Sequence, residues 1–349
     1  MISPARQTAS DVLRKVSQGG YASDLLLERS TQLDSRDAGL ATEIVFGCLR
    51  YQAQLDYLIA RRVPRPPELE VRIALRMGIY QLRYLDRIPP HAAVSESVEL
   101  VKRLGRAAAS GLVNAILRKT DRKVVPWPDR ATELSLPAWL LERWDRQFGT
   151  ETTNQIAAAF LEPAETHIAS TGRIQDIGAQ SVVPFLDLHP GQTFLDLCAA
   201  PGNKTAQAIA YGVHTVACDI HLHRLTQMRG LNCSLALLDG TQPFPFRAKF
   251  DRILIDAPCS GTGTMGRNPE IKWRLEPSHL IGLHAKQVAL VRQALPHLCP
   301  GGRLVYSTCS LENEENQQVI DELPGTWQIS ERLPGLNPGD GFFVAVYLG

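Results

Sequence analysis

The stretch DRILIDAPCSGTG, residues 251–263, decides the fold class. Residues 252–255 form a short run rich in apolar β-branched side chains, with turn-forming residues after it, which is typical of a buried central strand. The run delivers an acid, Asp256, then Pro258 and a thiol, Cys259, to the carboxyl end of that strand. Open α/β sheets bind their ligands at this edge. The stretch therefore predicts an α/β sheet with a functional site at its carboxyl edge.

A second predicted strand, residues 303–306, ends in a similar way, in Ser307-Thr308-Cys309-Ser310. Either cysteine alone would more often belong to a core. Two thiols delivered by two strand ends indicate chemistry rather than packing.

The loop DLCAAPGNKT, residues 196–205, follows a predicted strand at 193–197 and precedes a helical stretch at 206–211. A loop of small residues between a strand and a helix lets the backbone approach a ligand closely, with amide groups and the positive end of the helix facing it. The loop has neither the GxxxxGK[ST] nor the GxGxxG spacing, so we do not expect pyrophosphate recognition.

Four successive predicted strands end in or near an aspartate. These strands are predicted at 193–197, 213–218, 235–238 and 252–255. An acid at the end of the second strand suits the hydroxyl groups of a ribose. A single strand-end aspartate is often only a helix cap, but the set indicates an adenosine-type cofactor: Asp196, Asp219, Asp239 and Asp256.

The front of the chain has a different pattern, with apolar residues at helical spacing and breaks at glycines and prolines. We predict an all-α bundle with helices from residue 5 to 16, near 25–27, from a cap at Asp34 or Ser35 to 49, and at 68–85, 92–104 and 107–117. Residues 1–125 hold 20 Lys and Arg against 13 Asp and Glu, a net charge of +7, whereas the remainder carries −6. The excess of positive charge indicates either a polyanion partner or a merely solvated helical surface.

Length and composition limit the other classes. A chain of 349 residues should form about two domains. Its seven cysteines include no CxxC pair, so neither a zinc site nor a disulfide framework is supported. His221 and His223 lie two residues apart without other metal ligands in view, so we do not expect a metal site there. No apolar run approaches about 18 residues. We expect a soluble, cytoplasmic monomer without a metal or a membrane partner.

Two segments of the front half, IPPHAAVSESVELVKRLG (88–105) and GLVNAILR (111–118), resemble the NusB-type helical domain, an RNA-binding module. A connector at 124–129 and helices at 134–149 and 151–160 follow. Phosphate contacts position a protein on RNA without reading its sequence. The basic residues that we expect to make them are Arg6, Arg14, Lys15, Arg61, Arg62, Lys102, Arg103 and Arg106.

Four motifs of the second half resemble the RsmB/Sun (Nol/Nop/Sun) family of S-adenosylmethionine-dependent RNA cytosine carbon-5 methyltransferases: DLCAAPGNKT, DAPCSGTG, NPEIKWR and STCSLENEEN. The resemblance covers nearly the whole chain and includes a final strand within GDGFFVAVYLG, residues 339–349. It implies a Rossmann-like methyltransferase domain at 175–349, preceded by the NusB-like domain at 1–125 and by a helical linker with a shortened RNA-binding subdomain at 126–174. The implied substrate is RNA, in particular small-subunit (16S) rRNA.

The resemblance also implies residue roles. Cys309 would be the nucleophile that attacks carbon 6 of the cytosine, Cys259 would help release the product, and Asp256 with Lys204 would hold the ring. Position alone does not rank the thiols, since in DNA cytosine methyltransferases the Pro-Cys thiol attacks. The implied cofactor residues are Cys198, Ala199, Ala200, Pro201, Gly202, Asn203, Lys204, Asp219 at the ribose, Asp239 at the adenine, and Asp256. Substrate-side residues would be Arg267, Asn268 and Lys272.

The chain departs from the family pattern at two places. Asn203 stands where members usually have a second glycine, and because Asn tolerates positive φ we expect the loop to survive. Only residues 164–174 separate Pro163 from Gln175, where the family carries an α/β RNA-contacting subdomain. Two rival functions follow: an RNA-binding or ribosome-assembly factor of weak activity that retains the fold, and a DNA cytosine methyltransferase, which the RNA-type motifs disfavour.

Overall fold

The structure, a computed structural model, describes residues 2–348 and divides into two compact units. The first runs to Glu162 and also takes in Gly266–Arg274; the second holds Pro163–Met265 and the chain from Leu275 onward. Residues 126–162, which the sequence analysis assigned to a linker, thus group with the first unit. Each unit is described by itself below.

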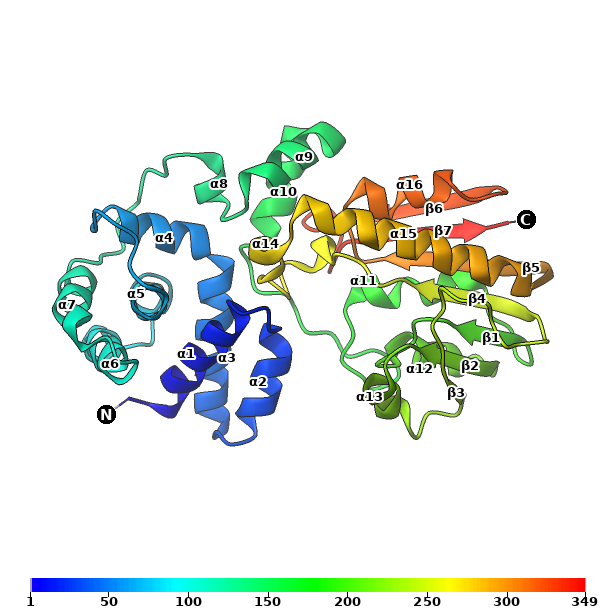
Figure 1. Ribbon diagram of the computed structural model, residues 1–349, viewed down its shortest axis with the longest axis horizontal. Helices are drawn as coiled ribbons and strands as arrows, with labels where there is room; N and C mark the ends of the chain where they lie inside the picture. The colour runs from blue at the N-terminus through cyan, green and yellow to red at the C-terminus, as the bar shows by residue number, and fades with distance from the viewer. Residues whose placement is uncertain (1, 349) are drawn as a thin grey trace. The chain divides into compact units, whose positions relative to one another are not determined.

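The first unit is helical (Figure 1). Its predicted all-α character is confirmed, since the described residues of this unit form helices and no strands. Asp34 is the cap of the third helix, where its carboxylate accepts a hydrogen bond from the Asp37 amide at 2.8 Å. The sequence analysis missed the helix Gln52–Ala60. The α-helices are α1 (Pro4–Val16), α2 (Ala22–Ser30), α3 (Ser35–Arg50), α4 (Gln52–Ala60), α5 (Leu69–Tyr84), α6 (Pro90–Arg103), α7 (Ser110–Arg118), α8 (Arg130–Glu133), α9 (Ala138–Phe148), α10 (Thr150–Ala159) and α14 (Ile271–Arg274).

The second unit contains a seven-stranded sheet of order β3-β2-β1-β4-β5-β7-β6. Neighbouring strands from β3 to β5 pair in parallel, and β7 pairs antiparallel with both β5 and β6. This order is the predicted Rossmann-like α/β fold, with the final strand in its expected place; Gly349 lies outside the described residues. The sequence analysis missed β6. The strands are β1 (Thr193–Asp196), β2 (His214–Asp219), β3 (Ser234–Leu237), β4 (Phe250–Asp256), β5 (Leu298–Thr308), β6 (Trp327–Arg332) and β7 (Phe342–Tyr347).

Successive side chains of β4 point to opposite faces of the sheet and fill two different cores. Ile253 and Ile255 pack in the cluster that includes residues of α15 (Pro277–Ala294), the long helix drawn along the sheet in Figure 1. Leu254 packs instead with residues 182–188 and with the short α12 (Asn203–Ile209). A strand buried on both faces reads as a continuous apolar run, which is why the sequence revealed it. The remaining α-helices are α11 (Ile177–Gln180), α13 (Leu222–Leu225) and α16 (Gln317–Asp321).

Parallel pairing brings the strand ends to one edge of this sheet. Asp196, Asp219 and Asp256 are the last residues of β1, β2 and β4, and Asp256 lies opposite Ser307 of β5. The loops that leave this edge carry the two candidate thiols, Cys259 and Cys309, and most of the loop predicted to bind the cofactor. None of the helices within residues 2–348 is long and apolar enough to cross a membrane.

Candidate active site

The two candidate thiols meet at the carboxyl edge of the sheet. Because β4 and β5 are parallel neighbours, the loops that follow them lie side by side, and they carry Cys259 and Cys309 respectively. The two Sγ atoms are 3.4 Å apart, within hydrogen-bond distance for sulfur, and both residues are half-buried. The sequence analysis anticipated that both thiols reach one edge, and the structure shows them in contact.

The contact couples the two thiols. The pKa of Cys259 is raised well above its usual value, first by the hydrogen bond with Cys309 and then by burial. A raised pKa favours the protonated form of the Cys259 thiol. Either sulfur can act as the donor in the hydrogen bond between them.

Lys204 and Asp256 form an ion pair beside the thiols. The Lys204 Nζ lies 2.6 Å from Asp256 Oδ2, and the Ser307 hydroxyl donates to Asp256 Oδ1 at 2.9 Å. Burial opposes the charge on Lys204, but the charge of Asp256 and its hydrogen bond outweigh burial, so the pKa of Lys204 is raised. The site therefore keeps an ammonium group next to a carboxylate at the end of β4.

A fully buried carboxylate, Glu315, links the two thiol loops. It accepts hydrogen bonds from the backbone amide of Ser260 at 2.8 Å, from the Ser310 hydroxyl at 2.5 Å and from Gln287 at 3.0 Å, and it also bonds the Ser260 hydroxyl. Ser260 follows Cys259 and Ser310 follows Cys309, so this one side chain fixes the spacing of both loops. Sequence reasoning missed Glu315, because the pattern of acids near residues 312–315 gives no sign of partners 28 to 55 residues away.

On the other side of the site, the loop after β1 begins α12 with Gly202 at φ +95°, a conformation that favours glycine. Asn203 does not share it. This residue starts α12 with ordinary helical geometry, and its side chain bonds Arg173 at 2.8 Å and the carbonyl of Ile174 at 3.3 Å. The expectation that Asn203 is tolerated through positive φ is therefore wrong: its side chain holds the 173–174 segment instead.

The strand-end acids are fixed by short loops. Asp219 accepts from the amides of Ala200 at 3.3 Å and His221 at 2.8 Å. Asp239 accepts from the Thr241 hydroxyl at 2.7 Å and from its amide, and these hydrogen bonds lower the pKa of Asp239. Asp196 is buried with Oδ1 unpartnered, and burial raises its pKa to about 7. Asp219 and Asp239 therefore hold carboxylates ready for hydroxyl or amine donors.

Several of these groups line one cavity of about 500 Å³, whereas Lys204 and the predicted cofactor residues Ala199, Pro201, Gly202 and Asn203 are not among its lining residues. The candidate residues among its lining are Cys198, Ala200, Asp219, Asp239, Asp256, Cys259 and Cys309. Sequence reasoning missed four polar lining residues, His221, Arg224, Thr241 and Lys286, of which His221 was considered only as a metal ligand. Thr241 could have been found from the sequence, because it follows Asp239 by two residues and can donate to that carboxylate across a tight turn. Lys286 lies on α15, and no motif marks it. Within residues 2–348, no three His, Cys, Asp or Glu side chains gather as metal ligands.

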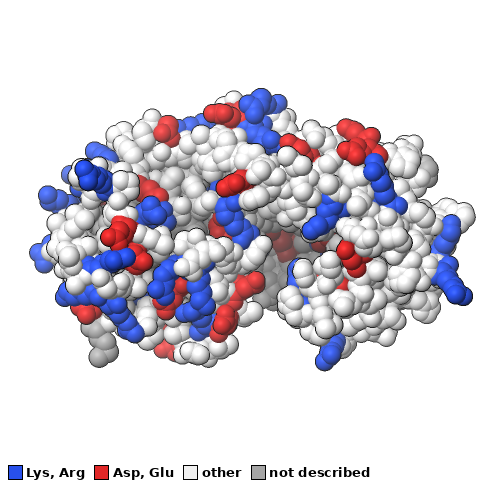
Figure 2. All heavy atoms as spheres, viewed as in Figure 1, with Lys and Arg blue, Asp and Glu red and all other residues white. Residues whose placement is uncertain are grey.

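Two groups of expected contact residues are not where the sequence analysis placed them. Lys272 is 1% exposed and donates to the carbonyls of Arg50 and Phe160, so its expected position at the substrate is wrong. Arg267 and Asn268 group with it in the helical unit, and their substrate-side role stays a prediction. Arg6 is buried and bonds Gln81 at 2.7 Å and Glu96 at 2.9 Å, so it is not a phosphate contact. Figure 2 shows the surface Lys and Arg of the helical unit interleaved with Asp and Glu on the visible face.

Comparisons with known proteins agree with this geometry. Residues 183–332 match the family model described as 16S rRNA methyltransferase RsmB/F, and residues 3–122 match the NusB family model. The chain is 31% identical to the ribosomal RNA small subunit methyltransferase B of Citrobacter koseri, over 97% of this chain and 96% of that protein. It is 30% identical to the probable ribosomal RNA small subunit methyltransferase B of Bacillus subtilis, over 90% and 87%. The Citrobacter alignment spans 414 positions against 349 residues here, so that relative holds residues that this chain lacks.

Among solved structures, the crystal structure of PH0851 covers 99% of both chains with a TM-score of 0.80 at 20% identity, which shows a shared fold. The family models and the full-length relatives lead to the same assignment. The chain belongs to the RsmB family of S-adenosylmethionine-dependent 16S rRNA methyltransferases, with a NusB domain at its front.

Proposed function

We propose that this protein is a cytoplasmic enzyme that methylates carbon 5 of a cytosine in 16S rRNA through a covalent bond between Cys309 and carbon 6 of the base. The observation that carries the proposal is the pair of thiols, with Sγ atoms 3.4 Å apart, in the same cavity as the strand-end acids. A simple methyl transfer to oxygen or nitrogen needs no thiol. Carbon 5 of cytosine is too weak a nucleophile to react until a thiolate adds at carbon 6.

The residues around Asp219 and Asp239 fit S-adenosylmethionine. Asp219 and Asp239 offer carboxylate oxygens at the end of β2 and just past β3, and Cys198 and Ala200 of the loop after β1 line the same cavity. Carboxylates accept hydrogen bonds from ribose hydroxyls and from an adenine amino group. When bound, S-adenosylmethionine supplies an electrophilic methyl group.

The chain's own residues can carry the remaining steps. The Cys309 thiol gives up its proton to solvent and its sulfur forms a bond to carbon 6, while the Lys204 ammonium, held by Asp256, stabilises the negative charge that develops on the ring at nitrogen 3. Once carbon 5 carries the methyl group, a solvent base removes its proton. The electrons of that C–H bond re-form the double bond between carbons 5 and 6, and the bond between sulfur and carbon 6 breaks. Cys259, whose pKa is raised, is placed to donate a proton to the departing sulfur. The target base must leave any stack, at a cost of a few kcal/mol.

The test is methyl transfer to unmodified 16S rRNA with tritiated S-adenosylmethionine, followed by nucleoside analysis. We expect the label in 5-methylcytidine. Label in any other nucleoside would overturn the proposal. A matched DNA of the same sequence should take up no label, and the reverse preference would favour a DNA cytosine methyltransferase.

One observation favours a second candidate, an RNA-binding or ribosome-assembly factor of weak activity. Only residues 164–174 stand where the family resemblance implies an RNA-contacting subdomain. No incorporation of label, with binding of S-adenosylmethionine intact, would support this second function. The intact thiol pair and ion pair favour the first.

A further inference from the structure

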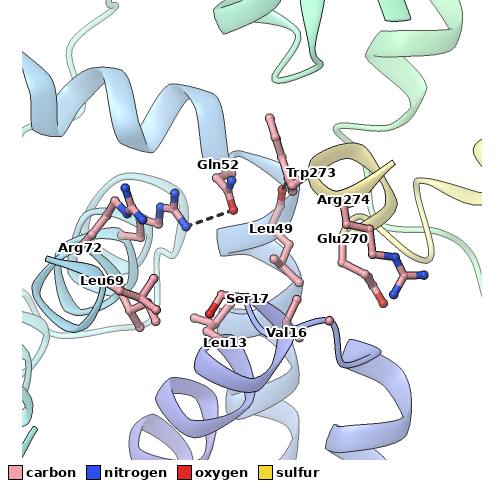
Figure 3. A pocket seen from close by; sticks show the side chains of 13 residues that line it. Leu13, Val16, Ser17, Leu49, Gln52, Leu69, Arg72, Glu270, Trp273 and Arg274 are labelled. Atoms are coloured by element: carbon pink, nitrogen blue, oxygen red, sulfur yellow. Dashed lines mark hydrogen bonds between the residues drawn. The ribbon is translucent and has the colours of Figure 1, made fainter. Parts of the chain in front are cut away.

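The helical unit contains a cavity of its own, of about 250 Å³, which the methyl-transfer chemistry does not use. Its walls come from the end of α1, the junction of α3 and α4, the first half of α5 and the segment 270–274 (Figure 3). Pockets that enclose drug-sized ligands measure about 300–1,000 Å³. This cavity is smaller and suits a single planar ring system.

Most polar side chains of the cavity already have partners. Arg76 pairs with Asp56 and donates to Gln52 at 3.1 Å, and the Ser17 hydroxyl donates to the carbonyl of Arg14. The guanidinium of Arg274 lies over the Tyr21 ring at 3.9 Å. These groups are held within the protein and need no ligand.

Two polar side chains on opposite sides of the cavity do not have all their partners (Figure 3). Glu270 is 1% exposed; its Oε1 accepts from the Ala22 amide at 3.0 Å, but its Oε2 is buried without a partner. On α5, the Nε of Arg72 is also buried without a partner. A buried polar atom without a hydrogen bond costs free energy, and burial raises the pKa of Glu270 accordingly. A ligand that satisfies both atoms would recover that cost.

The space between these two residues is apolar and partly aromatic. Leu13, Val16 and Leu69 line it, and Trp273 borders it with its indole fixed by a 2.7 Å hydrogen bond to the carbonyl of Leu49. Unpaired bases bind to proteins in this way, with apolar or aromatic contact to the ring and hydrogen bonds to its edges.

The donor and acceptor types select one base. A carboxylate only accepts and a guanidinium only donates, so the ligand needs donors on one edge and acceptors on another. Guanine carries adjacent donors at N1 and N2 and acceptors at O6 and N7. Adenine, cytosine and uracil each carry an acceptor atom next to their donor, and that acceptor would face the carboxylate. The cavity therefore matches guanine.

We propose that this cavity binds the base of one guanine nucleotide, with Glu270 accepting from N1 and N2 and Arg72 donating to O6 or N7. The chemistry of the cavity carries the proposal, and only the source of the guanine, an unpaired nucleotide in RNA, rests on the proposed function. A free guanine nucleotide has the same base, so the experiment must separate the two sources.

The test uses the full-length protein, without S-adenosylmethionine, and fluorescein-labelled heptamers of sequence UUUGUUU and UUUAUUU. Fluorescence anisotropy should show at least about tenfold tighter binding of the guanine heptamer. Glu270→Gln keeps an acceptor for the Ala22 amide but replaces Oε2 by a donor, and it should reduce the preference to less than about twofold. Arg72→Met should weaken the preference as well. The matched control, Glu28→Gln, removes an exposed carboxylate from α2 and should leave the preference unchanged.

Competition with guanosine and adenosine monophosphates identifies the source. If guanosine monophosphate competes and adenosine monophosphate does not, and if both variants lose this selectivity, the base alone suffices for binding. If the preference for guanine is seen only with the heptamers, the cavity is assigned to RNA. Equal binding of the two heptamers by the wild-type protein with no selective competition, or a preference that survives both substitutions, would overturn the proposal. Thermal unfolding by circular dichroism checks that each variant is folded. Because no methyl transfer is measured, failure here is distinct from failure of the proposed function.

Discussion

Two buried lysines, one in each unit, behave in opposite ways. Lys204 lies 2.6 Å from the Asp256 carboxylate, and its pKa is raised despite burial. Lys272 reaches only the carbonyl oxygens of Arg50 and Phe160, at 3.3 Å each, and burial lowers its pKa to about 7. Both residues lie in motifs that the sequence marks as functional. The difference shows that the partner, rather than the motif, decides whether a buried amine keeps its charge.

The comparison separates chemistry from packing. Substitutions around Lys204 and the thiols should change turnover with little change in folding, whereas substitution of Lys272 should change the stability of the helical unit with little change in turnover. The following variants test that separation, from the largest expected effect on turnover to the smallest.

Cys309→Ala should reduce methyl transfer to 16S rRNA by at least about 10⁴-fold, because no other group in the cavity takes over the attack on carbon 6. Its free energy of unfolding should stay within about 1 kcal/mol of the wild type, since the thiol is half-buried. Single-turnover kinetics and urea unfolding provide the two measurements. Cys299→Ala, at a half-buried thiol outside the four motifs and at the opposite end of β5, is the control and should retain full activity.

Lys204→Met should reduce turnover by roughly 10²- to 10³-fold, because it removes the ammonium next to the reacting ring. The unfolding transition should move by only about 1 kcal/mol, since the Asp256 side chain remains 31% exposed to water. Methyl-transfer kinetics at saturating cofactor measure the first effect. Turnover within about threefold of the wild type would remove Lys204 from the chemistry and break the comparison.

Glu315→Gln should reduce kcat by roughly 10- to 100-fold while KM for RNA changes little, because the amide replaces one acceptor oxygen by a donor where Ser260 and Ser310 both donate. The thiol loops then lose their fixed spacing but the cavity remains. Asp321→Asn, an exposed carboxylate on α16, is the matched control. An unchanged kcat, with the protein folded, would contradict the role of Glu315 in positioning the loops.

Lys272→Met should leave turnover within about threefold of the wild type but alter the pH dependence of stability. The folded pKa of about 7 lies below the ordinary value of 10.5, so between these values the unfolded chain binds more protons and wild-type stability rises with pH. We expect the unfolding free energy of the wild type, relative to the variant, to increase by about 4 kcal/mol from pH 6 to pH 10. Urea unfolding of the helical unit at several pH values measures it. A constant difference would show that Lys272 stays charged.

Local patterns in the sequence predicted much of this molecule. The apolar runs of β1, β2, β4 and β5 are buried on both faces and bounded by turns, and each leads to an acid or a thiol, so both the sheet and its functional edge could be predicted. The helical front could be predicted for a similar reason, because its apolar residues repeat at helical spacing over whole helices.

Contacts between distant residues could not be predicted in this way. Arg6 looked like a surface cation, yet its partners Gln81 and Glu96 are 75 and 90 residues away. Lys272 looked like a substrate residue within a motif that also holds Glu270, yet the segment packs into the helical unit. The edge strand β6 was missed because each of its residues is half-buried or exposed and none is buried, which leaves only a weak apolar signal.

The central claim, that the Cys309 sulfur attacks and Cys259 releases the product, is tested most directly by trapping the protein on its RNA. Purified Cys259→Ala protein is incubated with unmodified 16S rRNA and S-adenosylmethionine and run on a denaturing gel. The account predicts a slow, ribonuclease-sensitive band for Cys259→Ala that is absent from Cys309→Ala and from the double variant. A covalent band with Cys309→Ala, and none with Cys259→Ala, would contradict it.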